Sequence, residues 1–168
     1  MKHICLIFVL SLFSVAVFAG EKCELTLSSA PALFNLKLGM SGTEAKNAVG
    51  GKLNIKNKKE GVFFKNFIKR SPPRNLDGVR AVYLRFFDSK IYQIEIFYKS
   101  LYKDREIHEF VRYFSAENDL NIDLWQIKNG IAKLECSGFS IISDNYLNLR
   151  VQITDDEQLA AFKESKSK

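Results

Sequence analysis

Residues 79–98, VRAVYLRFFDSKIYQIEIFY, carry the clearest structural pattern in this chain. Apolar side chains occupy every second position before and after an Asp-Ser-Lys turn. The alternating positions are Val82, Leu84 and Phe86 before the turn, and Tyr92, Ile94, Ile96 and Tyr98 after it. Strict alternation on both sides of a short polar turn is typical of an antiparallel hairpin with one buried face. The stretch therefore predicts the centre of an antiparallel sheet.

Helical patterns lie on either side of this hairpin. In residues 104–114, Ile107, Phe110, Val111 and Phe114 are spaced i, i+3, i+4 and i+7, which predicts an amphipathic helix. Ser41 stands three residues before Glu44, the capping-box spacing, and residues 50–51 are a Gly-Gly stop, so a short helix is expected between them. A third helix is expected from residue 155 to about 163, with acids first and lysines last.

Further short alternating runs complete the predicted sheet. They lie at residues 23–27, 52–70, 125–136 and 138–154, with turns at 129–130 and 144–145. The expected fold is α+β, an antiparallel sheet with helices packed on one face. Residues 86–96 match residues 141–151 when shifted by 55 positions, which favours two tandem helix-plus-four-strand units at 36–99 and 104–154. Alternation alone also produces part of this match.

The N-terminus resembles an export signal. A short positive start precedes an apolar run over residues 4–18, and small residues at Val17 and Ala19 suit a signal peptidase. We expect cleavage after Ala19, which leaves one domain at 20–168 without a transmembrane helix. An uncleaved anchor is the alternative, although a bilayer span needs about 20 apolar residues. The expected location is the bacterial periplasm or the exterior.

Two cysteines, Cys23 and Cys136, remain after this cleavage. In an exported protein they most simply form one disulfide. Lipidation of Cys23 is rejected, because that processing requires a small residue where Lys22 stands.

Positive charge is concentrated in residues 52–74. The precursor carries a formal charge of +6, and loss of residues 1–19 removes Lys2 and leaves +5. The segment has one acid, Glu60, and eight basic residues: Lys52, Lys56, Lys58, Lys59, Lys65, Lys69, Arg70 and Arg74. It could bind an anionic lipid or polysaccharide. The alternative is a solvated hairpin whose charges prevent edge-to-edge pairing.

Two stretches resemble a known family. LKLGMSGTEAKNAVGG, residues 36–51, followed by VYLRFFDSKIYQIEI, residues 82–96, is similar to the outer-membrane assembly proteins of the BamE/SmpA/OmlA family and to the related β-lactamase-inhibitor-like fold. The resemblance covers residues 36–99. It implies a helix docked on a sheet and a sheet or loop surface that binds protein partners. The family's lipidation site is missing here, its members usually contain one unit, and the resemblance implies no catalytic residues.

The residues indicate binding rather than catalysis. His108 is the only histidine after cleavage, and no nucleophile, phosphate-loop or metal-ligand motif is present, so we expect no enzyme activity, metal or cofactor. Four aromatic residues are candidates for an exposed, partner-binding sheet face: Tyr83, Phe97, Tyr102 and Trp125. Closure of the core under loops is the alternative for them. The leading hypothesis is an envelope scaffold or inhibitor that binds a protein, followed by an anionic-ligand binder. Nucleic acid is not an expected partner of an exported chain.

Overall fold

The computed structural model describes residues 23–49, 62–65, 78–99, 106–145 and 149–167, with the backbone alone for 62–65. The predicted signal peptide lies outside the described residues. So do Tyr102 and the basic segment apart from the backbone at Lys65.

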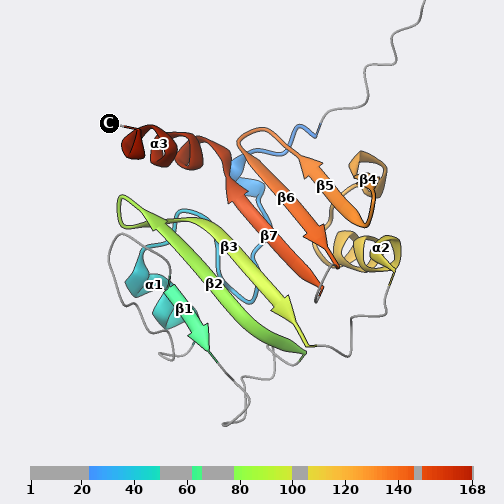
Figure 1. Ribbon diagram of the computed structural model, residues 1–168, viewed down its shortest axis with the longest axis horizontal. Helices are drawn as coiled ribbons and strands as arrows, with labels where there is room; N and C mark the ends of the chain where they lie inside the picture. Colours follow the sequence, from blue (N-terminus) through green and yellow to red (C-terminus); the bar gives the residue numbers. More distant parts are fainter. Residues whose placement is uncertain (1–22, 50–61, 66–77, 100–105, 146–148, 168) are drawn as a thin grey trace, which may run out of the picture.

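The described strands form one antiparallel sheet, as predicted. Its spatial order is β1-β2-β3-β7-β6-β5-β4, and every neighbouring pair is antiparallel. The strands are β1 (Val62–Lys65), β2 (Val79–Phe87), β3 (Lys90–Tyr98), β4 (Gln126–Lys128), β5 (Ile131–Glu135), β6 (Phe139–Asp144) and β7 (Arg150–Asp155). Figure 1 shows them side by side, with β3 next to β7 at the centre. The strand expected at 23–27 is instead a bridge from Cys23 to Cys136 followed by a 3-10 turn, η1 (Leu27–Ser29).

The β2–β3 hairpin has the predicted turn but contains an unpredicted bulge. Asp88 and Ser89 both have positive φ, 48° and 64°, as a two-residue primed turn requires. Arg85 pairs with Gln93 and Phe86 with Ile91, so Tyr92 is the extra residue of a β-bulge. The prediction that Tyr92 faces the core with Ile94 is therefore wrong. Ile91 takes the core position and is fully buried.

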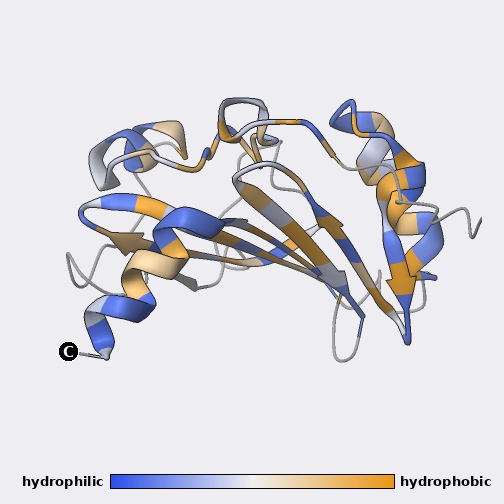
Figure 2. Cartoon of the chain, turned by 90° about the horizontal axis from the view of Figure 1, so that it is seen from above, coloured by the Kyte–Doolittle hydropathy of each residue, from blue (hydrophilic) through white to orange (hydrophobic). Residues whose placement is uncertain are grey.

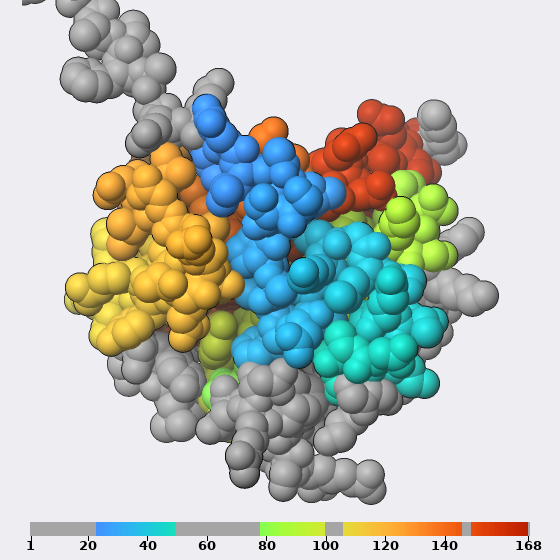
Figure 3. Space-filling model, turned by 180° about the vertical axis from the view of Figure 1, so that it is seen from behind, coloured from blue at the N-terminus to red at the C-terminus, as the bar shows by residue number. Residues whose placement is uncertain are grey.

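One face of the sheet is the core. Ile94, Ile96, Ile141, Val151 and Ile153 are completely buried on it. It is covered by the N-terminal segment, through Leu33 and Leu36, and by helices α1 (Gly42–Ala48) and α2 (Ile107–Glu117). Figure 3 shows this covered side, with the N-terminal segment in blue between α1 and α2. The four apolar positions predicted for α2 are all buried.

Helix α3 (Asp156–Lys166) departs from the prediction that the helices pack on one face. In Figure 2 it lies on the opposite side of the sheet from α1. Its Phe162 stacks on Tyr92, which the bulge turns away from the core. The alternating period of the sequence assigned Tyr92 to the core face, whereas the extra residue in β3 places its ring where Phe162 contacts it.

The predicted capping box of α1 is present. Ser41 Oγ accepts a hydrogen bond from Glu44 N at 3.3 Å, and Glu44 Oε2 accepts one from Ser41 N at 2.7 Å. Two hydrogen bonds from Ser41 lower the pKa of Glu44 below its ordinary 4.5. The bond from the Ser41 backbone has the larger effect and the bond from its hydroxyl the smaller. Both bonds favour the charged carboxylate.

This lowered pKa predicts a pH-dependent contribution to stability. A carboxyl whose pKa is lower in the folded state stabilises above its unfolded-state pKa, and that stabilisation disappears as pH falls through the folded-state pKa. We therefore expect Glu44→Gln to be less stable than wild type at pH 7, with the difference shrinking below about pH 4.5. Urea unfolding of both proteins from pH 7 to pH 3 measures this. A difference independent of pH would contradict it.

Candidate functional site

The second face of the sheet is the candidate site. It consists of the side chains of β2, β3, β7 and β6 that point away from the core, and we call it the open face. Figure 1 views it directly, and among the described helices only α3 lies over it, at one end. Its members are Tyr83, Arg85, Phe87, Tyr92, Gln93, Glu95, Phe97, Ser140, Ile142, Asp144, Arg150, Gln152 and Thr154, as placed by the strand register.

Two aromatic side chains meet on this face. The rings of Tyr83 and Phe97 lie with their centroids 5.2 Å apart at 70°, an edge-to-face contact. Both side chains are half-buried, so part of each ring reaches solvent. The sequence predicted both as partner-binding residues, and the structure brings them together although they come from different strands.

An ion network lies beside the aromatic pair. Arg150 Nε donates to Asp144 Oδ2 at 2.9 Å, Arg150 Nη2 donates to the same oxygen, and Arg150 Nη1 donates to Glu95 Oε1 at 3.3 Å. One guanidinium thus joins three strands, β3, β7 and β6. The two carboxylate side chains are 10% exposed and the arginine side chain is 30% exposed. The network was not predicted, because 55 residues separate Glu95 from Arg150 and neither has a local motif.

The charges of the sheet's outward side are mixed. Exposed Arg85 and the Lys133–Glu135 ion pair of β5 add to the network, so both signs alternate over a short distance. Such a surface does not concentrate anions in the way that a uniformly basic one does. It instead suits another surface that carries both charges.

The other predicted site residues have different positions. Trp125 is buried at 8% exposure and packs edge-to-face on Phe114 of α2, with ring centroids 6.2 Å apart. The prediction that Trp125 lies on the exposed sheet face is therefore wrong. The alternative, that its side chain helps to close the core, is correct. Its position after the 3-10 turn η5 (Ile122–Leu124) directs it under α2. Tyr102 and the side chains of the basic segment lie outside the described residues.

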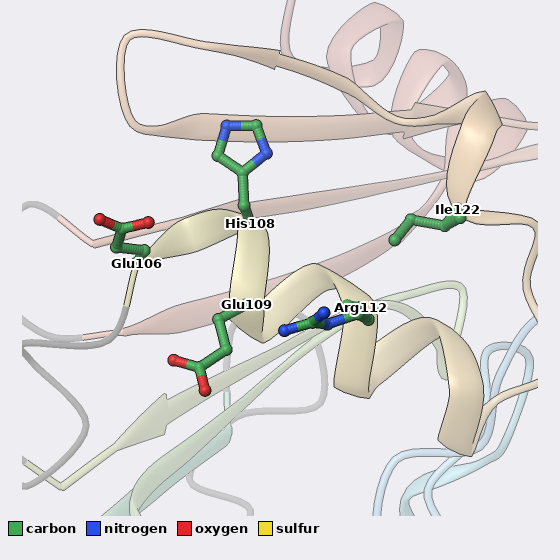
Figure 4. Close-up of a pocket in the computed structure, with 5 residues that line it drawn as sticks. All are labelled: Glu106, His108, Glu109, Arg112 and Ile122. Atoms are coloured by element: carbon green, nitrogen blue, oxygen red, sulfur yellow. The ribbon is translucent and has the colours of Figure 1, made fainter.

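A hollow beside α2 is the second candidate site. It has a volume of 440 Å³, is widely open, and is lined by Glu106, His108, Glu109, Arg112 and Ile122. Figure 4 shows His108 and Glu109 pointing in opposite directions from the helix. Within the described part of the chain, no three histidine, cysteine or acidic side chains are grouped as a metal site requires. The polar side chains that line the hollow are therefore not grouped as metal ligands.

The predicted disulfide between Cys23 and Cys136 is present, with the two Cα atoms 4.5 Å apart. No helix in the described ranges is both long and apolar enough to span a bilayer. None of the protein families, curated proteins or solved structures with which the chain was compared matches it.

Proposed function

We propose that this protein is an exported, non-catalytic binding module that acts on another envelope protein as a scaffold or inhibitor. The observation that carries the proposal is the open face, where the Tyr83–Phe97 pair stands beside the Arg150 network. Interface hot spots are enriched in tyrosine and arginine and are surrounded by polar groups. The resemblance to the BamE/SmpA/OmlA family supports the same kind of function.

A protein surface is the occupant that best fits this chemistry. The aromatic pair offers apolar ring surface, while Arg85, Gln152 and the network offer donors and acceptors of both charges. A polyanionic lipid or polysaccharide would gain little from a face on which two carboxylates, Glu95 and Asp144, accompany Arg150. The partner is therefore expected to present an apolar side chain flanked by charges of both signs.

Export is proposed from two features. The apolar N-terminal run followed by small residues is typical of a cleaved signal peptide. The Cys23–Cys136 disulfide is favoured in an oxidising compartment, such as the bacterial periplasm or the exterior.

We also propose that the domain is built from two tandem units. The strand order is mirrored about the β3–β7 pair, with β2 and β1 on one side and β6 and β5 on the other. A helix precedes each series of strands in the chain, α1 in the first and α2 in the second. The match between residues 86–96 and 141–151 supports the same division.

Site-specific photo-crosslinking in cells of the protein's own host tests the binding function. A photoreactive amino acid replaces Gln152, at the centre of the open face, or, as the matched control, exposed Lys46 on α1. We expect a single protein adduct from position 152 and none from position 46, identified by mass spectrometry. Tyr83→Ala combined with Phe97→Ala should reduce the adduct about tenfold or more, because truncated hot-spot aromatics dominate binding energy.

Three outcomes would contradict the proposal. Equal adducts from both positions would indicate nonspecific contact, and an adduct unchanged by the alanine pair in a folded protein would exclude the aromatic site. Retention of lipid or glycan alone, released by raised salt, would support the anionic-ligand hypothesis. In that case charge reversal at Lys56, Lys58, Lys59 and Lys65 should abolish retention.

A further inference from the structure

Helix α3 is attached to the sheet differently from α2. Five residues of α2 are buried, whereas no residue of α3 is. Leu159 and Phe162 of α3 are half-buried, and its last turn from Lys163 onward is exposed. A helix that buries so little surface depends on a few contacts for its position.

The first turn of α3 is firmly held. Asp155 caps it by accepting a hydrogen bond from Gln158 N at 2.9 Å, and Asp155 itself is only 3% exposed. Asp156 accepts a bond from Ser140 Oγ at 2.8 Å, and its backbone N donates to Gly138 O at 3.2 Å. These bonds fix where the helix starts, at the end of β7.

Beyond the first turn, the aromatic contacts of Phe162 hold α3 on the sheet. Its ring stacks on Tyr92, with centroids 5.4 Å apart and planes at 25°, and meets Phe87 edge-on at 5.9 Å. Tyr92 is 3% exposed in this arrangement. Phe87 and Tyr92, which we call the aromatic seat, therefore lie on the open face beneath α3.

The seat and the Tyr83–Phe97 pair occupy the same two strands. Both comprise one ring from β2 and one from β3, and Gln93 and Glu95 lie between them on β3. The open face thus has an aromatic group on each side of a polar centre. One group is partly open to solvent, and the other holds an aromatic side chain from the protein's own helix.

We infer that the aromatic seat is a second binding site for the same partner, occupied in the free protein by Phe162 as a stand-in for an aromatic side chain of that partner. This inference rests on the proposed binding function. Binding detaches α3 beyond its capped first turn, because Tyr92 is 3% exposed with Phe162 stacked on it, so another aromatic side chain reaches its ring only when Phe162 leaves. The partner is therefore expected to present an aromatic side chain to the seat and an apolar side chain to the Tyr83–Phe97 pair, with polar groups between the two.

Hydrogen exchange on the free, full-length protein tests the attachment. We expect amides in the last two turns of α3 to exchange faster than those of β3 and β7, and Phe162→Ala to accelerate them about tenfold, since it removes two ring contacts. Phe162→Tyr keeps the ring and should retain protection, and Lys163→Ala, an exposed neighbour, should match wild type. Protection equal to that of β3, or unchanged in Phe162→Ala, would overturn the inference.

Crosslinking from position 152 tests the role in binding. Phe162→Ala empties the aromatic seat, so the partner no longer has to displace a side chain of the protein itself. This variant should therefore raise the adduct yield several-fold when the partner is present in a limiting amount. Tyr92→Ala should lower it. If the adduct forms but neither variant changes it, the inference fails and the binding function stands. If no protein adduct forms in any variant, both fail.

Discussion

Replacing Cys23 and Cys136 together by alanine should lower the free energy of unfolding by about 4 kcal/mol. The disulfide joins positions 113 residues apart, and closing so long a loop removes much conformational freedom from the unfolded chain. In the folded state it secures the N-terminal segment, where Ser137 N also donates to Leu25 O at 3.0 Å. Urea denaturation of the oxidised wild type and the double variant measures the difference.

Reduced wild type is the control for this experiment. It keeps both side chains but lacks the bond, so it should unfold near the same urea concentration as the double variant. Reduced wild type and the double variant should both still fold, because Leu33 and Leu36 anchor the N-terminal segment in the core without the disulfide. These two side chains are 4% and 0% exposed. Equal midpoints for oxidised and reduced wild type would show that the bond does not stabilise the fold.

Replacing Arg150 by methionine should destabilise the protein by about 2 kcal/mol. The change leaves the carboxylates of Glu95 and Asp144, each 10% exposed, on the same face without their shared cation. Loss of one partner from a fully buried pair costs about 3–5 kcal/mol, and the smaller value here reflects the 30% exposure of Arg150. Chemical denaturation at pH 7 measures the cost.

The loss of stability in Arg150→Met has two possible sources, the carboxylates left without a cation and the lost packing of the arginine stem. A variant that also neutralises the carboxylates separates them. Adding Glu95→Gln and Asp144→Asn to Arg150→Met removes the uncompensated charges, so most of the stability should return. The exposed Arg85→Met is the matched control and should change stability by less than about 0.5 kcal/mol. If the triple variant is no more stable than Arg150→Met, lost packing of the arginine stem would explain the effect instead.

The amino-acid sequence contains local signals for most elements of this fold. Alternation at Val82 to Phe86 and the Asp88-Ser89 turn specify the central hairpin, because side chains on a strand alternate between two faces. The capping box at Ser41 and Glu44 and the 3.6-residue spacing of α2 similarly depend only on neighbours in the chain. The disulfide partners also followed from the sequence, since two cysteines remain after the expected cleavage.

Local sequence patterns identified only part of the candidate site. Tyr83 and Phe97 were recognised as aromatic residues on an outward strand face, but the same argument also selected Trp125, which is in the core. Alternation distinguishes two faces of a strand and does not show which residues helices will cover. The packing of α2 over Trp125 settled that point.

By itself, the sequence determined the antiparallel sheet, the amphipathic helix, the cap and the disulfide, because each depends on short-range spacing or on a single pairing. The tertiary structure decided the bulge that turns Tyr92 to the open face, the docking of Phe162 on it, and the sharing of Arg150 by Glu95 and Asp144. These features join residues 6 to 70 positions apart through strand register and side-chain packing. Register and packing are set when the whole sheet assembles, since a shift of one residue exchanges its two faces.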